Sequence, residues 1–172
     1  FLFGIEENLE KLIKENLGHF VPYEVLREEF VKVLRITAPS RIEGFDVSHF
    51  YGNYTVASCV VWEDGAMNKR RYRRYRIKTV EKIDDYASLE EVLTRRAIRL
   101  KEGKDPMPDL WLIDGGLAHL TVATKVRDRY NLPIKVLSLA KGEEILYTEF
   151  GDKIPLKDHP ILYRVFGQIR DE

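Results

Sequence analysis

The stretch Arg41-Ile42-Glu43-Gly44-Phe45-Asp46-Val47-Ser48-His49 places a carboxylate inside an alternating apolar segment, and Asp109-Leu110-Trp111-Leu112-Ile113-Asp114-Gly115-Gly116 ends a second apolar segment with another. Aspartate is depleted in strands, and an unpaired charge is costly to bury. If the two strands lie side by side, Asp46 and Asp114 repel one another unless a positive group sits between them. A divalent metal is the simplest such group. The two segments therefore indicate a metal-dependent enzyme that acts on phosphates.

Length and composition are those of one ordinary domain: 172 residues, 44% hydrophobic and 33% charged. No apolar run approaches the roughly 20 residues of a membrane helix. Cys59 is the only cysteine, so no internal disulfide can form, and a reducing, cytoplasmic compartment is expected. The formal net charge is +0, so a nucleic-acid partner would have to be held by a local basic surface.

The first half of the chain predicts two helices followed by a three-strand meander. Helical spacing of apolar residues covers 5–17 and 25–33, and alternation then covers 41–48, 54–63 and 70–78. Asp64-Gly65 is a turn signal between the second and third strands. Ser88 and Glu91 form a capping-box pattern, which predicts a helix over about 86–101.

The second half predicts a strand, a helix and a second strand, followed by a hairpin and a last helix. The strands fall at 110–113 and 134–139, the hairpin covers 145–156, and the last helix begins near Pro160. The chain is therefore expected to be an α/β protein. Its mixed sheet combines an antiparallel three-strand meander with two parallel strands, and helices flank it.

The two aspartates can meet at one edge of this sheet. Period two puts Asp46 on the same strand face as Gly44, and Asp114 emerges at the carboxyl end of its own strand, where ligands of open sheets bind. Mg²⁺ and Mn²⁺ take oxygen ligands and keep several waters, so two carboxylates and a phosphate suffice. The alternatives are a buried hydrogen-bonded aspartate and an Asp-Gly turn residue. Asp84 and Asp85 offer a third carboxylate or a helix N-cap.

Basic residues concentrate in 69–78, where tyrosines are interleaved with arginines. A strand with cations on both faces must expose at least one of them to solvent or to a polyanion. A charged edge strand explains this block as well as phosphate-backbone binding does. Arg95 and Arg96 on the next helix could extend the basic surface.

The histidines and the paired glycines are weaker signals. His49 follows Asp46 by three residues and could approach the site, although a loop histidine is more often a surface residue. His119, His159 and His19 have weaker claims. Gly115-Gly116 could cradle a phosphate at a helix start, or could simply let helix and strand pack closely.

Seven blocks in order resemble the C-terminal endonuclease domain of the UvrC family, the incision nucleases of bacterial nucleotide excision repair. The blocks are Gly44 to His49, Val56 to Ser58, Asp84 to Ser88, Val92 to Arg96, Leu112 to Gly116, Leu139 to Glu144 and Gln168 to Glu172. The resemblance spans roughly 41–172 and implies a ribonuclease-H-like endonuclease domain, preceded by a helical lead-in over 1–40.

The resemblance also implies function and site residues. It implies cleavage of damaged double-stranded DNA on the 5′ side of a lesion, dependent on Mg²⁺ or Mn²⁺, in concert with UvrB. Catalytic roles are implied for Asp46, Asp114 and Asp85, of which Asp46 and Asp114 hold the metal. The family completes its site with a histidine shortly after the last block, where this chain ends, so inactivity of this fragment is an expectation. The residues expected to contact DNA are Arg70, Arg71, Arg73, Arg74, Arg76, Arg95, Arg96 and Lys141.

Two other functions remain open from the sequence. One is a non-catalytic DNA-docking module with the same fold, which would bind DNA but show no incision to lose on mutation of Asp46. The other is a small-molecule phosphate-binding domain that uses Gly115-Gly116, which would bind nucleotide without salt-dependent affinity for duplex DNA.

Overall fold

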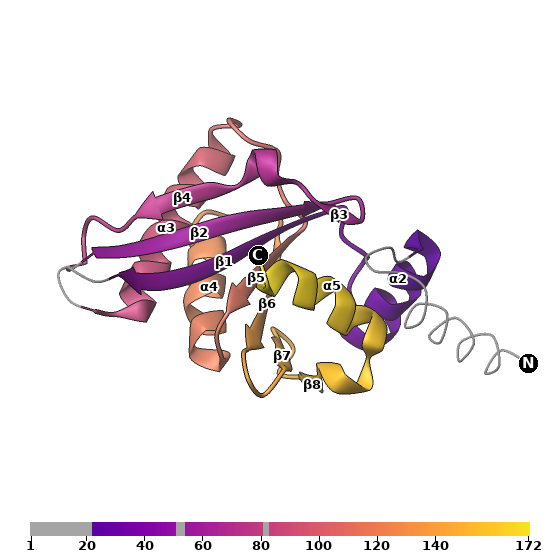
Figure 1. Ribbon diagram of the computed structural model, residues 1–172. Helices are drawn as coiled ribbons and strands as arrows, with labels where there is room; N and C mark the ends of the chain where they lie inside the picture. The colour runs from indigo at the N-terminus through magenta and orange to yellow at the C-terminus, as the bar shows by residue number, and fades with distance from the viewer. Residues whose placement is uncertain (1–21, 51–53, 81–82) are drawn as a thin grey trace, which may run out of the picture.

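The computed structural model describes residues 22–50, 54–80 and 83–172, and within them eight strands form one mixed sheet (Figure 1). The strand order is β3-β2-β1-β5-β6-β7-β8, and β4 pairs with β2 beside β3. The strands are β1 Arg41–Phe50, β2 Tyr54–Glu63, β3 Ala66–Met67, β4 Arg73–Arg76, β5 Leu110–Asp114, β6 Lys135–Ala140, β7 Ile145–Thr148 and β8 Lys153–Pro155.

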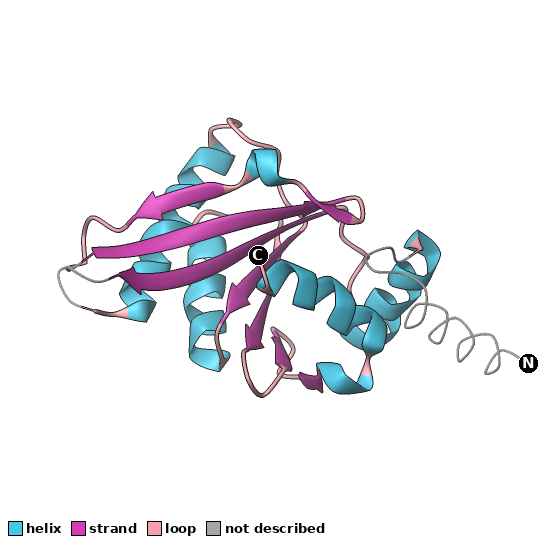
Figure 2. Cartoon of the chain, in the orientation of Figure 1, coloured by secondary structure: helices cyan, strands magenta, loops and turns pink. Residues whose placement is uncertain are grey.

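Helices cover both faces of the sheet (Figure 2). The helices α3 Asp85–Lys101 and α4 Leu117–Arg129 pack on one face, where Phe45, Trp111 and Ile113 belong to their core. On the other face lie α2 Tyr23–Glu29, the π-helical turn η1 Phe30–Leu34, the 3₁₀ turn η3 Leu156–Asp158 and α5 Pro160–Arg170. The strands of the centre are apolar on both sides because each side meets a helical layer.

The central strand β1 pairs antiparallel with β2 and parallel with β5. The turn from β2 to β3 contains only Asp64 and Gly65, both at positive φ (49° and 98°), as a type I′ hairpin requires. The predicted turn is therefore confirmed. The predicted strands 41–48, 54–63, 110–113 and 134–139 correspond to β1, β2, β5 and β6 within two residues at each end.

The predicted third strand over 70–78 is wrong as a single element. It is interrupted by a 3₁₀ turn, η2 Lys69–Arg71, so that only Arg73–Arg76 forms β4. Asn68 explains the interruption: its side chain accepts a hydrogen bond from Arg70 N (3.2 Å) and donates one to Glu63 (2.7 Å). These side-chain bonds compete with strand pairing.

The predicted capping box at the start of α3 is also wrong. Asp84 is the N-cap, and its carboxylate accepts the Ala87 N–H at 3.0 Å. Glu91 instead accepts the backbone N–H groups of Lys78 and Thr79. Ser88 is buried within the helix.

The predicted helix over 25–33 corresponds to α2 and η1, whereas the one over 5–17 lies outside the described residues. Leu26, Phe30 and Leu34 are buried in the same core cluster as α5. The rings of Phe30 and Phe166 meet edge to face with centroids 5.7 Å apart. This contact holds the start of the described chain against its last helix.

The end of α5 rests directly on β1 at Gly44. A Cβ at this position would lie 2.6 Å from Ile169 Cγ2 and 3.1 Å from Val60 Cγ2. Only a residue without a side chain lets the helix approach the strand this closely, two residues before Asp46. None of the helices in the described part of the chain is long and apolar enough to cross a membrane.

Candidate active site

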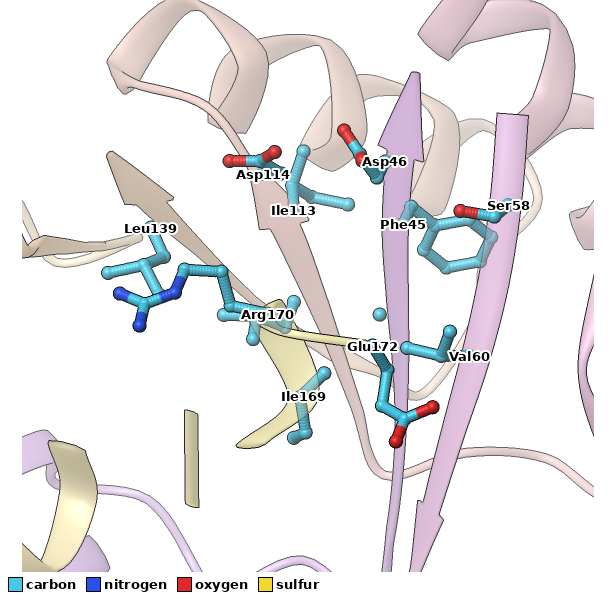
Figure 3. Close-up of a pocket in the computed structure, with 12 residues that line it drawn as sticks. Phe45, Asp46, Ser58, Val60, Ile113, Asp114, Leu139, Ile169, Arg170 and Glu172 are labelled. Atoms are coloured by element: carbon cyan, nitrogen blue, oxygen red, sulfur yellow. The ribbon is translucent and has the colours of Figure 1, made fainter. Parts of the chain in front are cut away.

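Asp46 and Asp114 end up side by side because of the β1–β5 register. Phe45 pairs with Ile113, and each aspartate is the next residue along its parallel strand. Gly44, which faces α5, is two residues before Asp46, and Leu112, in the core cluster with α5, is two residues before Asp114. Both carboxylates therefore leave the same face of the sheet, at neighbouring strand ends (Figure 3).

The two neighbouring carboxyl groups affect the pKa of Asp46. Burial, followed by the neighbouring Asp114 carboxyl group, raises the pKa of Asp46 to about 6, and Lys141 opposes the shift. The Lys141 ammonium lies 3.3 Å from Asp114 Oδ2, and its side chain is 53% exposed. The pair thus has one exposed cation beside it.

Two cavities meet at the pair. A small one of about 60 Å³ lies on the α5 side, where Ile169, Arg170 and Glu172 line it together with both aspartates. A larger one of about 350 Å³ opens at the strand ends, and it is also lined by Asp85, His119 and Lys141. All three predicted acidic positions therefore line one cavity.

Of the two consecutive aspartates, Asp84 is the helix cap and Asp85 faces the larger cavity. Asp85 pairs with His49 Nε2, and His49 Nδ1 is 2.9 Å from Thr55 Oγ1. His49 thus reaches Asp85 rather than the pair itself. The predicted N-cap is therefore Asp84, and a role of Asp85 as third carboxylate stays a prediction.

His119 lines the larger cavity, although the sequence gave only a weak indication that it belongs to the site. Its Nδ1 accepts the Gly116 N–H at 3.3 Å, and its ring centroid lies 4.8 Å from that of Tyr86. Gly115 (φ 153°) makes room for the ring, since a Cβ there would lie 2.3 Å from it. A histidine at the third helical position after a glycine N-cap is the signal that could have found it.

The two glycines before α4 use their own N–H groups internally. Gly115 N donates to Leu139 O at 3.0 Å, and Gly116 N donates to His119. Neither N–H is free to hold a phosphate. This argues against the small-molecule phosphate-binding function, which depended on the N–H groups of these two glycines.

Across residues 22–50, 54–80 and 83–172, no group of three or more His, Cys, Asp or Glu side chains could by itself hold a metal ion. The pair still fits a hard divalent cation, because two adjacent carboxylates supply oxygen ligands and Mg²⁺ or Mn²⁺ keeps several waters. Burial and the neighbouring Asp114 carboxyl raise the pKa of Asp46, and a bound cation would lower it. Water and substrate oxygens would have to complete the coordination.

The predicted DNA-contacting residues are distributed over both faces of the sheet. Asp46 pairs with Ser58, and Ser58 pairs with Arg74, so Arg74 and Arg76 share the face of the acidic pair. Arg70 and Arg71 are exposed on η2. Arg73 points to the opposite face, 3.4 Å from Asp105.

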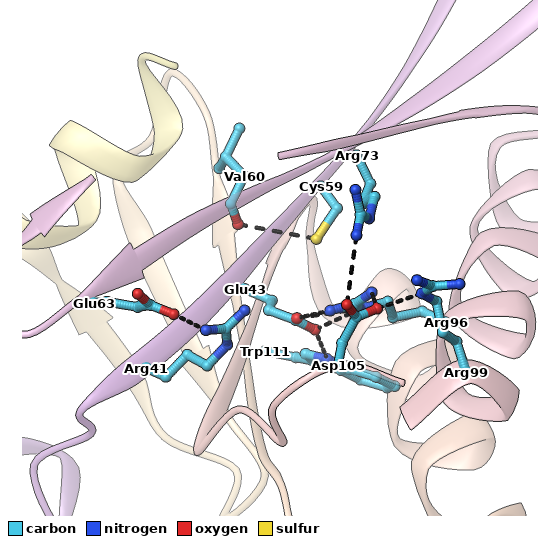
Figure 4. Close-up of polar contacts among 10 residues, drawn as sticks. All are labelled: Arg41, Glu43, Cys59, Val60, Glu63, Arg73, Arg96, Arg99, Asp105 and Trp111. Atoms are coloured by element: carbon cyan, nitrogen blue, oxygen red, sulfur yellow. Dashed lines mark hydrogen bonds and ion pairs between the residues drawn. The ribbon is translucent and has the colours of Figure 1, made fainter. Parts of the chain in front are cut away.

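Arg95 and Arg96 on α3 are held by internal partners. Arg95 donates to the Arg76 carbonyl at 2.8 Å and pairs with Glu91. Arg96 is 1% exposed and pairs with Glu43, which is 0% exposed, and with Asp105 at 2.8 Å (Figure 4). The prediction that Arg96 contacts DNA is wrong, because its guanidinium is buried and neutralises two carboxylates.

Comparison with known proteins identifies one matching family and several close relatives. Residues 31–172 match the profile of the UvrC RNAse H endonuclease domain. UvrABC system protein C of Aquifex aeolicus is 56% identical over 168 residues, which is 98% of this chain and 30% of the relative. The protein of the same name from Hydrogenobaculum is 52% identical over 172 residues, again 30% of the relative. The chain thus spans about 30% of the length of these relatives.

Solved structures are more distant. Endonuclease V of Ciona intestinalis, in complex with a 24mer DNA containing an inosine, has a TM-score of 0.46 and 15% identity, covering 99% of this chain and 67% of that chain. A Thermus thermophilus RuvC structure has a TM-score of 0.33 and 13% identity, covering 57% and 60%. The mixed sheet with helices on both faces and the family match confirm the expected ribonuclease-H-like fold.

Proposed function

The chain belongs to the family of the UvrC RNAse H endonuclease domain, and from that premise we propose that it is a divalent-metal-dependent DNA endonuclease domain. Its proposed reaction is the 5′ incision at damaged double-stranded DNA in nucleotide excision repair. The observation that carries the proposal is the convergence of Asp46 and Asp114 on one face, at adjacent ends of two parallel strands.

In this proposal Asp46 and Asp114 hold Mg²⁺ or Mn²⁺, and Asp85 acts from the rim of the same cavity. The ion, when bound, supplies positive charge for the scissile phosphate and lowers the pKa of water. Lys141, beside Asp114, neutralises part of the charge of the pair and of the incoming phosphate. Asp85 is oriented by its contact with His49.

The position of α5 supports a further part of the proposal. Its last residues, Ile169 and Arg170, and Glu172 just beyond it line the small cavity beside the pair. The family's histidine, which follows this block, would therefore enter next to the two carboxylates. Arg170 forms ion pairs with Glu144 and Asp171.

The remaining parts of the proposal concern the domain bounds, the compartment and the partners. We place residues 1–40 as a helical lead-in and 41–172 as the nuclease domain, acting in the bacterial cytoplasm with UvrB. Exposed arginines on the face of the pair, Arg74 and Arg76, would contact backbone phosphates without reading sequence.

Metal binding is the first test. Mn²⁺ is titrated calorimetrically into the wild type, Asp114→Asn and the control Asp64→Asn, which removes a carboxylate from a turn that asparagine also favours. We expect the wild type and Asp64→Asn to bind alike, and Asp114→Asn to lose at least tenfold in affinity. Equal Mn²⁺ affinity of the wild type and both variants would contradict the proposed site.

Incision is the second test, made on a chain carried on through the family's histidine. Asp46→Asn is expected to abolish Mn²⁺-dependent cutting of a lesion-containing duplex while its affinity for that duplex stays within about twofold of the wild type, because binding is dominated by phosphate contacts. A wild type that binds DNA but never cuts would support the docking module instead. The docking module is tested because the described residues contain no group of three or more His, Cys, Asp or Glu side chains that could hold a metal ion.

A further inference from the structure

The face that carries the acidic pair continues beyond it without a covering helix. The end of α5 lies over Gly44, and in the described chain no helix crosses the far ends of β1, β2 and β4 on this side (Figure 1). Along β1 the residues on this face after Asp46 are Ser48 and Phe50, because side chains alternate between faces. The surface next to the proposed nuclease site is therefore open sheet.

Two exposed aromatic rings occupy this open surface. Phe50 pairs with Tyr54 across β1 and β2, and the two are 52% and 43% exposed. Their rings stack, with centroids 5.6 Å apart and planes 18° apart. The Arg76 guanidinium lies 5.4 Å from the centre of the Tyr54 ring. We call Phe50, Tyr54 and Arg76 the aromatic platform.

The platform lies at a fixed distance from the acidic pair. Phe50 is four residues beyond Asp46 on the same strand and face, which is about 13 Å at roughly 3.3 Å per residue. This corresponds to about four base steps of B-form DNA at ~3.4 Å each. Arg74 lies on the same face, level with Asp46 and two strands away, and Arg76 lies level with Ser48, between the rows of Asp46 and Phe50. The two exposed arginines can therefore hold backbone phosphates alongside the path from the pair to the platform.

We propose that the aromatic platform stacks an unpaired base of the DNA strand that is cut, a few nucleotides from the scissile phosphate. This rests on the proposed function and deepens it by naming the substrate class as a duplex opened next to the incision point. Exposed aromatic rings combined with arginine bind bases of any sequence by stacking. A fully paired duplex keeps its bases stacked on one another, so it cannot use the platform. The positive charge of Arg74 and Arg76 favours a nucleic acid over a neutral apolar partner.

The chain contains a matched control at the other end of the sheet. Phe150, in the turn between β7 and β8, is 56% exposed, and the Arg35 guanidinium lies 5.1 Å from the centre of its ring. It reproduces an exposed ring beside an arginine but stands at the opposite edge of the sheet from β4. Phe150→Leu therefore reports the general effect of removing such a ring.

The test is equilibrium binding in EDTA of a fluorescein-labelled 12-mer of thymidines and of a 12-mer with the same backbone but abasic residues. We expect Phe50→Leu to weaken thymidine binding about fivefold to a hundredfold, and Phe50→Tyr, which keeps a ring, to stay within about twofold of the wild type. Phe150→Leu should match the wild type, and abasic binding should be the same in all variants.

Two results would overturn the platform. One is Phe50→Leu binding thymidines as tightly as Phe150→Leu, and the other is an equal loss for the abasic strand. Neither would affect the proposed function, which is judged separately by Mn²⁺ binding and by Asp46→Asn. A wild type with no salt-dependent affinity for the thymidine strand would also overturn the platform, and it would leave the proposed function to be decided on duplex DNA.

Discussion

Removing the Arg96 guanidinium should destabilise the fold strongly. Arg96 and Glu43 are 1% and 0% exposed, and without the arginine the Glu43 carboxylate keeps the hydrogen bond from Trp111 Nε1 at 3.1 Å. Breaking a buried ion pair at one partner costs about 3–5 kcal/mol, because the other charge is left uncompensated. For a domain of this size about 1 kcal/mol lowers Tm by about 2–4 °C, so Arg96→Met should lower Tm by about 6–20 °C.

The assay is urea unfolding followed by tryptophan fluorescence, with Arg74→Met as the control. Arg74 is exposed on β4, so its replacement should change the free energy of unfolding by less than about 0.5 kcal/mol. The double variant Glu43→Gln, Arg96→Met should recover part of the loss, since no buried charge is then left alone. If the free energy of unfolding of Arg96→Met lay within about 1 kcal/mol of that of Arg74→Met, the structural role of Arg96 would be refuted.

Three other changes give separate checks. In EDTA, the pKa of the Asp46 carboxyl is raised to about 6 in the native state, from an ordinary value of 3.8. Between these two pH values the native state binds more protons than the unfolded state, so the free energy of unfolding falls as the pH rises. Asp46→Asn should then be more stable than the wild type at pH 7.5 but not at pH 4, and an equal difference at both pH values in urea unfolding would contradict this. Gly44→Ala should cost about 1–3 kcal/mol, because its Cβ would overlap Ile169, and an unchanged Tm would refute the close contact. Asp84→Ala should cost about 0.5–2 kcal/mol through loss of the α3 cap, whereas Asp84→Asn, measured by the same denaturation, should cost little.

Much of the fold could be predicted because its strands alternate and its turns are short. The alternation around Gly44 and Asp46 already gave the face of the carboxylate, and the register of β1 with β5 brings Asp114 to the same face. The interruption at η2 could not be predicted from alternation, since it depends on the side-chain bonds of Asn68.

The role of Arg96 could not be predicted for a different reason. Its partner Glu43 lies 53 residues earlier in the sequence, on β1, so the contact depends on how α3 packs against the sheet. An arginine in a run of arginines has no local signal that distinguishes a buried ion from a surface one. The place of His119 in the cavity could not be predicted either, because it depends on the backbone of Gly115.

The contact between Gly44 and Ile169 has a consequence for biosynthesis. The acidic pair needs β1 and β5, and its wall needs the last turn of α5, so residues more than 120 positions apart must be joined. The loop-closure entropy of such long-range contacts slows folding. A nascent chain on the ribosome therefore holds only fragments of the site, and the acidic pair gains its α5 wall after almost the whole domain has emerged.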